Sequence, residues 1–247
     1  MGAVQGHGPL FILAGLAVGV LVGMTVVGGG SLMTPILLLL FGIHPATAVG
    51  TDLLYAAVTK TGGTVVHGLN HTVDWRVVAR LAAGSIPTTA LTLLALQFFS
   101  PNSHSSPLIS VVLGVALILT AISLLLRRQV LALATRRRRG PAPGNHTVLL
   151  TVATGAALGV LVSLSSVGAG ALGITALIFL YPNLPTAKIV GSDIAHAVPL
   201  TLIAGGGHWL MGTVDFGMLA WMVLGSLPGI VIGSQLSSRV PDAVLRT

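Results

Sequence analysis

The sequence predicts an all-α membrane protein, a polytopic helical bundle of two inverted repeats with broken or short re-entrant helices. Three observations lead to this prediction. Hydrophobic residues make up 53% of the 247 positions and charged residues only 7%, whereas an average soluble domain has roughly 25% charged residues. A long stretch of the first half recurs in the second half. The basic residues are concentrated in a few segments between apolar runs.

The internal repeat can be followed residue by residue. Gly15–Val27 aligns with Gly155–Val167, and Val49–Asp52 aligns with Val190–Asp193. Later equivalent pairs are His67 with His208, Asp74 with Asp215, and Gly84–Pro87 with Gly225–Pro228. Many secondary transporters consist of a duplicated apolar unit interrupted by glycines. We therefore predict repeat one at 1–126, a basic linker at 127–147 and repeat two at 148–247.

Apolar runs between polar or Pro/Gly breaks predict the helices. Those of repeat one are Leu10–Val26, Leu32–Phe41, Ala46–Leu69, Trp75–Phe99 and Leu108–Leu126. Those of repeat two are Val148–Leu164, Leu172–Leu180, Thr186–Leu210 and Phe216–Leu236. The strands of a β-barrel would show period-two alternation of apolar residues, and the sequence shows none. The second run of each repeat is shorter than the roughly 20 residues that span hydrocarbon, so we expect half of a broken or re-entrant helix.

Repeat two has no counterpart of the last helix of repeat one, so we expect its final span to be missing.

The distribution of arginines predicts the orientation. Six of the twelve basic residues lie in Arg127–Arg139, and such clusters mark cytoplasmic loops of membrane proteins. With that loop inside, all the arginines fall inside, and matching loops of the two repeats have opposite charge bias. The repeats should therefore be inserted upside down relative to each other. The basic charge thus reflects membrane topology, and we predict no nucleic-acid partner.

Two related segments resemble the sulfite exporter TauE/SafE family of membrane permeases. They are VVGGGSLMTPILLLLFGIHPATAVGTDL from Val26 to Leu53 and SVGAGALGITALIFLYPNLPTAKIVGSDI from Ser166 to Ile194. The resemblance covers the whole chain. It implies a protein of the bacterial inner membrane that moves a small inorganic or organosulfur anion, such as sulfite or a sulfonate.

Glycine-rich turns precede both short helices and are candidate anion sites. Free backbone N–H groups and the helix dipole at such a start attract an anion, and inversion would bring the two starts face to face. Close helix packing is the alternative explanation for these glycines. The two turns are Gly28-Gly29-Gly30-Ser31 and Gly168-Ala169-Gly170-Ala171.

Polar residues inside predicted spans are further candidates, because a buried charge in a membrane needs a partner or a wet cavity. Thr51 and Ser192 are assigned to substrate binding, and Asp52 and Asp193 either to coupling or to a structural role. Lys60 aligns with Thr201. It could neutralise the substrate or pair with Asp52, and pairing is favoured.

His67 and His208 lie late in equivalent spans, where they could relay protons or make structural hydrogen bonds. His44, His71, His104 and His146 fall in loops without metal-ligand spacing, so we predict no metal and no cofactor. The leading function is a secondary anion transporter that works by alternating access, with or without proton coupling. An anion channel is the alternative. A membrane-embedded enzyme is less favoured, because no catalytic motif occurs. A homo-oligomer is left open.

Overall fold

The structure, a computed structural model, describes residues 8–24, 32–99, 107–125, 145–168 and 170–239. These residues form nine helices and no strand. The helices are α1 (Gly8–Met24), α2 (Met33–Leu39), α3 (Pro45–Leu69), α4 (Trp75–Phe99), α5 (Pro107–Leu125), α7 (Asn145–Ser165), α8 (Ala171–Leu180), α9 (Thr186–Leu210) and α10 (Phe216–Arg239). Both α4 and α9 begin and end where the sequence predicts, and every other bound differs by three residues or fewer.

Four described segments are long and apolar enough to cross a membrane: Trp75–Phe98, His146–Ser165, Thr186–Leu210 and Phe216–Gly233. α3 is also 25 residues long but contains charged residues. α2 has seven residues and α8 has ten, too few to span hydrocarbon alone. The predicted all-α membrane fold is confirmed.

The polarity of the bundle suits a lipid solvent. Large apolar side chains such as Leu39, Leu69, Phe98 and Leu125 are exposed on the outside. Many Ser and Thr residues and two aspartates are buried inside. Lipid supplies no hydrogen bonds to polar groups, so these groups must be satisfied within the protein.

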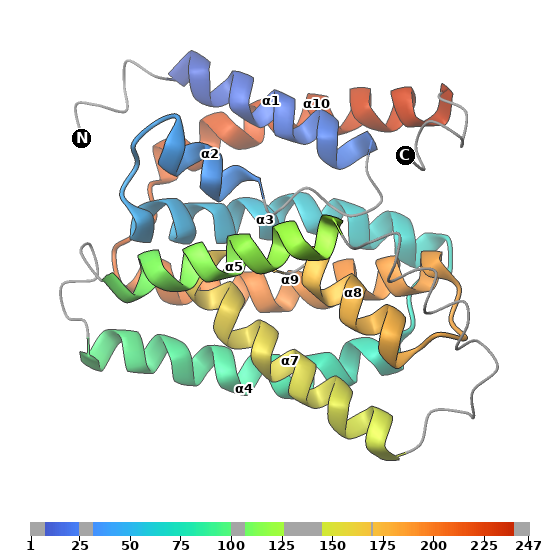
Figure 1. Ribbon diagram of the computed structural model, residues 1–247. Coiled ribbons are helices and arrows are strands. Elements are labelled where there is room, and N and C mark those ends of the chain that lie inside the picture. Colours follow the sequence, from blue (N-terminus) through green and yellow to red (C-terminus); the bar gives the residue numbers. More distant parts are fainter. Residues whose placement is uncertain (1–7, 25–31, 100–106, 126–144, 169, 240–247) are drawn as a thin grey trace.

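The outer helices pair across the two halves of the chain (Figure 1). α1 packs along α10, and α4 packs along α7. Both contacts depend on glycine: a Cβ at Gly84 of α4 would collide with the carbonyl oxygen of Val152, and a Cβ at Gly225 of α10 would collide with that of Ile12. Gly84 and Gly225 are equivalent in the repeat, so the two pairs have the same packing. Neither half of the chain is a separate body.

The equivalent helices α3 and α9 lie between these outer pairs (Figure 1). Gly50 near the start of α3 lies beside His208 near the end of α9, and Gly63 near the end of α3 lies beside Ile194 near the start of α9. The two helices therefore run antiparallel, as inversion of one copy relative to the other requires. The domain boundaries drawn from the sequence stay a prediction.

Candidate functional site

Charged and polar side chains from α3 and α9 meet in the interior of the bundle. Asp52 is 0% exposed, Asp193 is 1% exposed and Lys60 is 8% exposed. His196, one turn after Asp193, is also fully buried. Because charges are costly inside a membrane protein, this cluster, which we call the central site, is the strongest candidate for function in the described chain.

Asp52 lies against elements from both halves. Its Oδ2 accepts a hydrogen bond from the backbone N–H of Thr34 at 3.2 Å and another from the Thr34 hydroxyl. Ser166, just after α7, lies beside the same carboxylate. Asp52 Oδ1 and Ser166 Oγ have no hydrogen-bond partner among the described residues. Asp52 thus anchors the short helix α2, and its carboxylate lies beside the turn before α8.

Asp193 is the repeat partner of Asp52 but has a different environment. Its carboxylate packs against Gly173 of α8, where a Cβ would collide with Oδ1. In the described part of the chain, neither carboxylate oxygen has a hydrogen-bond partner. Its electrostatic partner is Lys60 of α3. The two equivalent carboxylates therefore differ. Asp52 is held by hydrogen bonds from Thr34, whereas Asp193 is stabilised mainly by the positive charge of Lys60.

Lys60 serves both carboxylates. It lies close enough to Asp193 and Asp52 to interact electrostatically with both, and also with His196. Sequence spacing favoured Asp52 as the partner, because both residues lie on α3. Antiparallel packing also brings Asp193 of the opposite repeat near Lys60, so a second carboxylate interacts with this lysine, and pairing with Asp52 stays a prediction. The equivalent residue, Thr201, donates a hydrogen bond to the Ala197 carbonyl of its own helix, so the site has one central cation for two carboxylates.

Two polar pairs were missed in the sequence. Ser85 Oγ lies 2.8 Å from Nε2 of His196, and Tyr55 lies near Ser226. Ser85 and Ser226 belong to the equivalent segments Gly84–Pro87 and Gly225–Pro228 of the two repeats. The repeat alignment could have drawn attention to these residues, because it places Tyr55 on His196 and Ser85 on Ser226. Tyr55 and His196 each lie three residues after the aspartate of their own repeat.

Thr51 and Ser192 point to helix starts of the opposite half. Thr51 Oγ1 accepts a hydrogen bond from the backbone N–H of Asp215 at 3.0 Å. Ser192 Oγ accepts one from the backbone N–H of Asp74 at 2.8 Å. These bonds join α3 to the start of α10 and α9 to the start of α4. They give both hydroxyls a structural role, and the predicted substrate contact stays a prediction.

The two histidines near the helix ends also form an equivalent pair of contacts. Nδ1 of His67 lies 2.8 Å from the Thr72 hydroxyl, and Nδ1 of His208 lies 3.0 Å from the Thr213 hydroxyl. Nε2 of His208 also contacts the carbonyl of Ser163 at 2.9 Å. These contacts tie each helix to the turn that follows it. They agree with the hydrogen-bonding alternative, and proton relay stays untested.

The glycine turn before α8 is partly described. Gly168 and Gly170 have φ angles of 116° and 143°, values that L side chains rarely adopt. Gly170 is the N-cap of α8 and Ala171 is the first helical residue, with no side-chain cap on the helix. Gly28, Gly29, Gly30, Ser31 and Ala169 lie outside the described residues, so the expected meeting of the two turns stays a prediction.

A buried, charged centre between antiparallel equivalent helices, inside an apolar shell, defines a multi-pass membrane protein of the transporter class. Among the described residues, no cluster of three or more His, Cys, Asp or Glu side chains could hold a metal ion.

The chain belongs to the sulfite exporter TauE/SafE family, whose family model matches residues 11–247. It is 42% identical over 229 residues to the probable membrane transporter protein YjnA of Bacillus subtilis (strain 168), covering 92% of this chain and 89% of the relative. A probable membrane transporter protein of Xylella fastidiosa (strain Temecula1 / ATCC 700964) is 25% identical, with 92% and 82% covered. No solved structure matches the chain. The family and the relatives agree with the resemblance found in the sequence.

Proposed function

We propose that this membrane transporter is a secondary carrier of a small sulfur-containing anion, such as sulfite or a sulfonate, across the bacterial inner membrane. The observation that supports the proposal is the central site, where Asp52, Asp193 and Lys60 are all buried between α3 and α9. The family suggests the class of anion, and the site suggests how its charge is handled.

The charge balance of the site favours proton coupling. With both carboxylates ionised and one lysine cation, the site is negative and repels an anion. A proton on either carboxylate removes one negative charge, so that the Lys60 ammonium group can also attract the substrate anion. Anion and proton then bind with positive linkage, each raising the affinity for the other. Asp193 is the better candidate to take the proton, because Asp52 already accepts two hydrogen bonds from Thr34.

The turn before α8 is the proposed anion contact. Its backbone at Gly168 and Gly170 precedes a ten-residue helix whose N-terminus carries a partial positive charge. Ser166 of the same turn lies beside Asp52, so this turn adjoins the central site. The equivalent turn at Gly28–Ser31 is proposed to contribute in the same way.

Alternating access in this fold would involve the outer helix pairs. Each outer pair joins one helix of each half, so a movement of one whole repeat against the other would break both glycine contacts. We therefore propose that α1–α10 and α4–α7 rock as units against α3–α9. Lys60 would shift its main interaction between Asp193 and Asp52 as the site changes its exposure.

Flux in proteoliposomes tests this function. Sulfite and methanesulfonate uptake would be measured with and without an imposed proton gradient. A carrier shows saturable flux that the gradient drives, whereas an anion channel shows flux that is insensitive to it. Consumption of sulfite without movement across the membrane would indicate an enzyme and contradict the proposal.

Leucine substitutions test the glycine turns separately. Gly170→Leu and Gly30→Leu should abolish anion flux, because they block backbone approach to the anion. Gly212→Leu is the matched control, since Gly212 also has a positive φ, 72°, and a Cβ there meets nothing within 4 Å. Unchanged flux in Gly170→Leu would remove the turn from the proposed site.

A further inference from the structure

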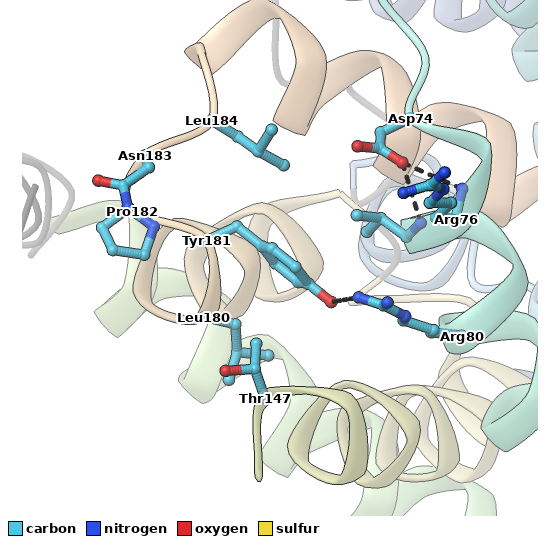
Figure 2. A pocket seen from close by; sticks show the side chains of 10 residues that line it. Asp74, Arg76, Arg80, Thr147, Leu180, Tyr181, Pro182, Asn183 and Leu184 are labelled. Atoms are coloured by element: carbon cyan, nitrogen blue, oxygen red, sulfur yellow. Dashed lines mark hydrogen bonds between the residues drawn. The ribbon is translucent and has the colours of Figure 1, made fainter. Parts of the chain in front are cut away.

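A separate pocket of about 370 Å³ lies at the end of the bundle where α4 begins and α8 meets α9. Figure 2 shows its side chains. Its polar lining residues are Asp74, Arg76, Arg80, Thr147, Tyr181 and Asn183. It shares no residue with the central site.

Arg80 is held in position by a chain of hydrogen bonds. Its guanidinium donates to the Tyr181 hydroxyl at 3.1 Å (Figure 2). That hydroxyl lies 2.8 Å from the Thr151 hydroxyl of α7. A guanidinium has five N–H donors, and this contact uses one of them. Arg80 is thus a preorganised donor at the pocket wall.

Arg76 adds a second cation that its neighbour Asp74 does not neutralise by a direct side-chain contact. Asp74 uses Oδ1 to accept hydrogen bonds from the backbone N–H groups of Arg76 and Val77 at 3.0 Å and 3.3 Å, which is the role of a helix N-cap. The Arg76 side chain has no hydrogen-bond partner within the described ranges. Two guanidinium groups and one carboxylate leave the pocket with a net positive charge.

The repeat provides an internal comparison. At the equivalent place in the other half, Gly217 aligns with Arg76, Trp221 with Arg80 and Phe41 with Tyr181. There Trp221 packs on Gly8, and Phe41 stacks on Phe11 with ring centroids 4.7 Å apart. The same fold is therefore built with apolar aromatic residues at one end and with arginines around a pocket at the other. Membrane topology explains why arginines lie at the inner end, but a snorkelling arginine needs neither a pocket nor a tyrosine that orients it.

We propose that this pocket binds a small oxyanion of the sulfonate, sulfate or phosphate type at the cytoplasmic end of the bundle. Arg76 and Arg80 donate to its oxygens, and guanidinium groups suit such tetrahedral anions because they can donate two parallel hydrogen bonds. The ligand is either a free oxyanion or the phosphate of a lipid headgroup, which present the same chemistry. This site is independent of the proposed transport function.

Protection from arginine modification tests the site. Purified protein in maltoside detergent, which contains no phosphate, would be treated with phenylglyoxal in sodium methanesulfonate or in sodium chloride of equal ionic strength. Mass spectrometry of peptides would give the modification rate of each arginine. Methanesulfonate should slow modification of Arg76 and Arg80 but not of the linker arginines Arg127–Arg139, which are the internal control.

A second arm identifies the source of the ligand. The same protein in nanodiscs containing phosphatidylglycerol would be treated without methanesulfonate. Protection in detergent with methanesulfonate indicates a free oxyanion, whereas protection only in nanodiscs indicates a lipid headgroup. Both results support the proposal. No protection in either arm, or equal slowing at Arg127–Arg139, would overturn it.

Two variants make the assignment specific. Arg76→Gln should raise the methanesulfonate concentration that gives half-maximal protection of Arg80 about tenfold. This is the factor expected when one charge-assisted hydrogen bond is lost. Lys188→Gln, which removes a cation of α9 outside the pocket lining, should leave protection unchanged. Equal effects of the two variants would mean that only the general charge of this end matters. Failure of transport in proteoliposomes would not alter these outcomes.

Discussion

The hydroxyl of Ser85 lies 2.8 Å from Nε2 of His196 and joins α4 of the first half to α9 of the second. Both residues are fully buried. The repeat-related residues Tyr55 of α3 and Ser226 of α10 also lie near each other, but the Tyr55 hydroxyl has no hydrogen-bond partner among the described residues. The Ser85–His196 contact thus connects a central helix to the outer pair α4–α7, and its counterpart in the other half is not a hydrogen bond.

The Ser85 contact predicts a loss of stability. Ser85→Ala leaves Nε2 of His196 buried without its partner, which costs about 1–3 kcal/mol. We expect a lower thermal unfolding midpoint in detergent. Thr154→Ala is the control, because Thr154 is only partly buried and its hydroxyl bonds within its own helix. An unchanged midpoint for Ser85→Ala would contradict the importance of this contact.

The aspartates predict how transport responds to protons. Asp193→Asn and Asp52→Asn remove a group that can gain and lose a proton, so anion flux should lose its dependence on a proton gradient. Proteoliposome flux at several gradients measures this effect. Asp215→Asn is the matched control, since asparagine caps a helix about as well as aspartate and Asp215 caps α10. Retained gradient dependence in both central variants would remove their coupling role.

Lys60 predicts a coupled effect on stability. Lys60→Thr, which installs the residue found at position 201, leaves buried carboxylates without their cation and should destabilise the fold by about 3 kcal/mol or more. Adding Asp193→Asn should recover part of that loss, because it removes one of the charges left unpaired. A double-mutant cycle of thermal unfolding measures the coupling. Strictly additive effects would show that the two side chains do not interact.

Gly173 predicts a functional defect without unfolding. Gly173→Ala places a Cβ against Oδ1 of Asp193, so the carboxylate must move, while alanine itself favours the helix. We expect strongly reduced flux with a nearly unchanged unfolding midpoint. Gly206→Ala, where nothing lies within 4 Å of a new Cβ, should transport normally. Normal flux in Gly173→Ala would show that the position of Asp193 is not critical.

The orientation can be tested because the chain has no cysteine. Thr135→Cys in the basic linker should react with a membrane-impermeant maleimide only after spheroplasts are permeabilised. Ser103→Cys, in the uncharged stretch between α4 and α5, should react in intact spheroplasts. The reverse pattern would place the Arg127–Arg139 loop outside and contradict the predicted topology.

Much of the fold is readable from the sequence because hydrocarbon imposes simple rules. Apolar length and breaking residues gave the bounds of α4 and α9 without error, since a lipid-facing helix must satisfy its backbone internally. Repetition identified Asp52 and Asp193 as equivalent. Contacts between helices were harder: spacing along α3 relates Lys60 to Asp52 alone, and nothing within a single span shows that His196 meets Ser85 of α4.

The sequence by itself determined the solvent of this protein, its helices and the equivalence of its halves, because these depend on local composition and on comparing one segment with another. Only the tertiary structure decided that α1 packs with α10, that α4 packs with α7, and that Asp193 of the second half comes near Lys60 of the first. These contacts join residues far apart in the chain, and they depend on how closely glycine backbones let two helices approach. That distance is a property of the packed pair and is present in neither helix alone.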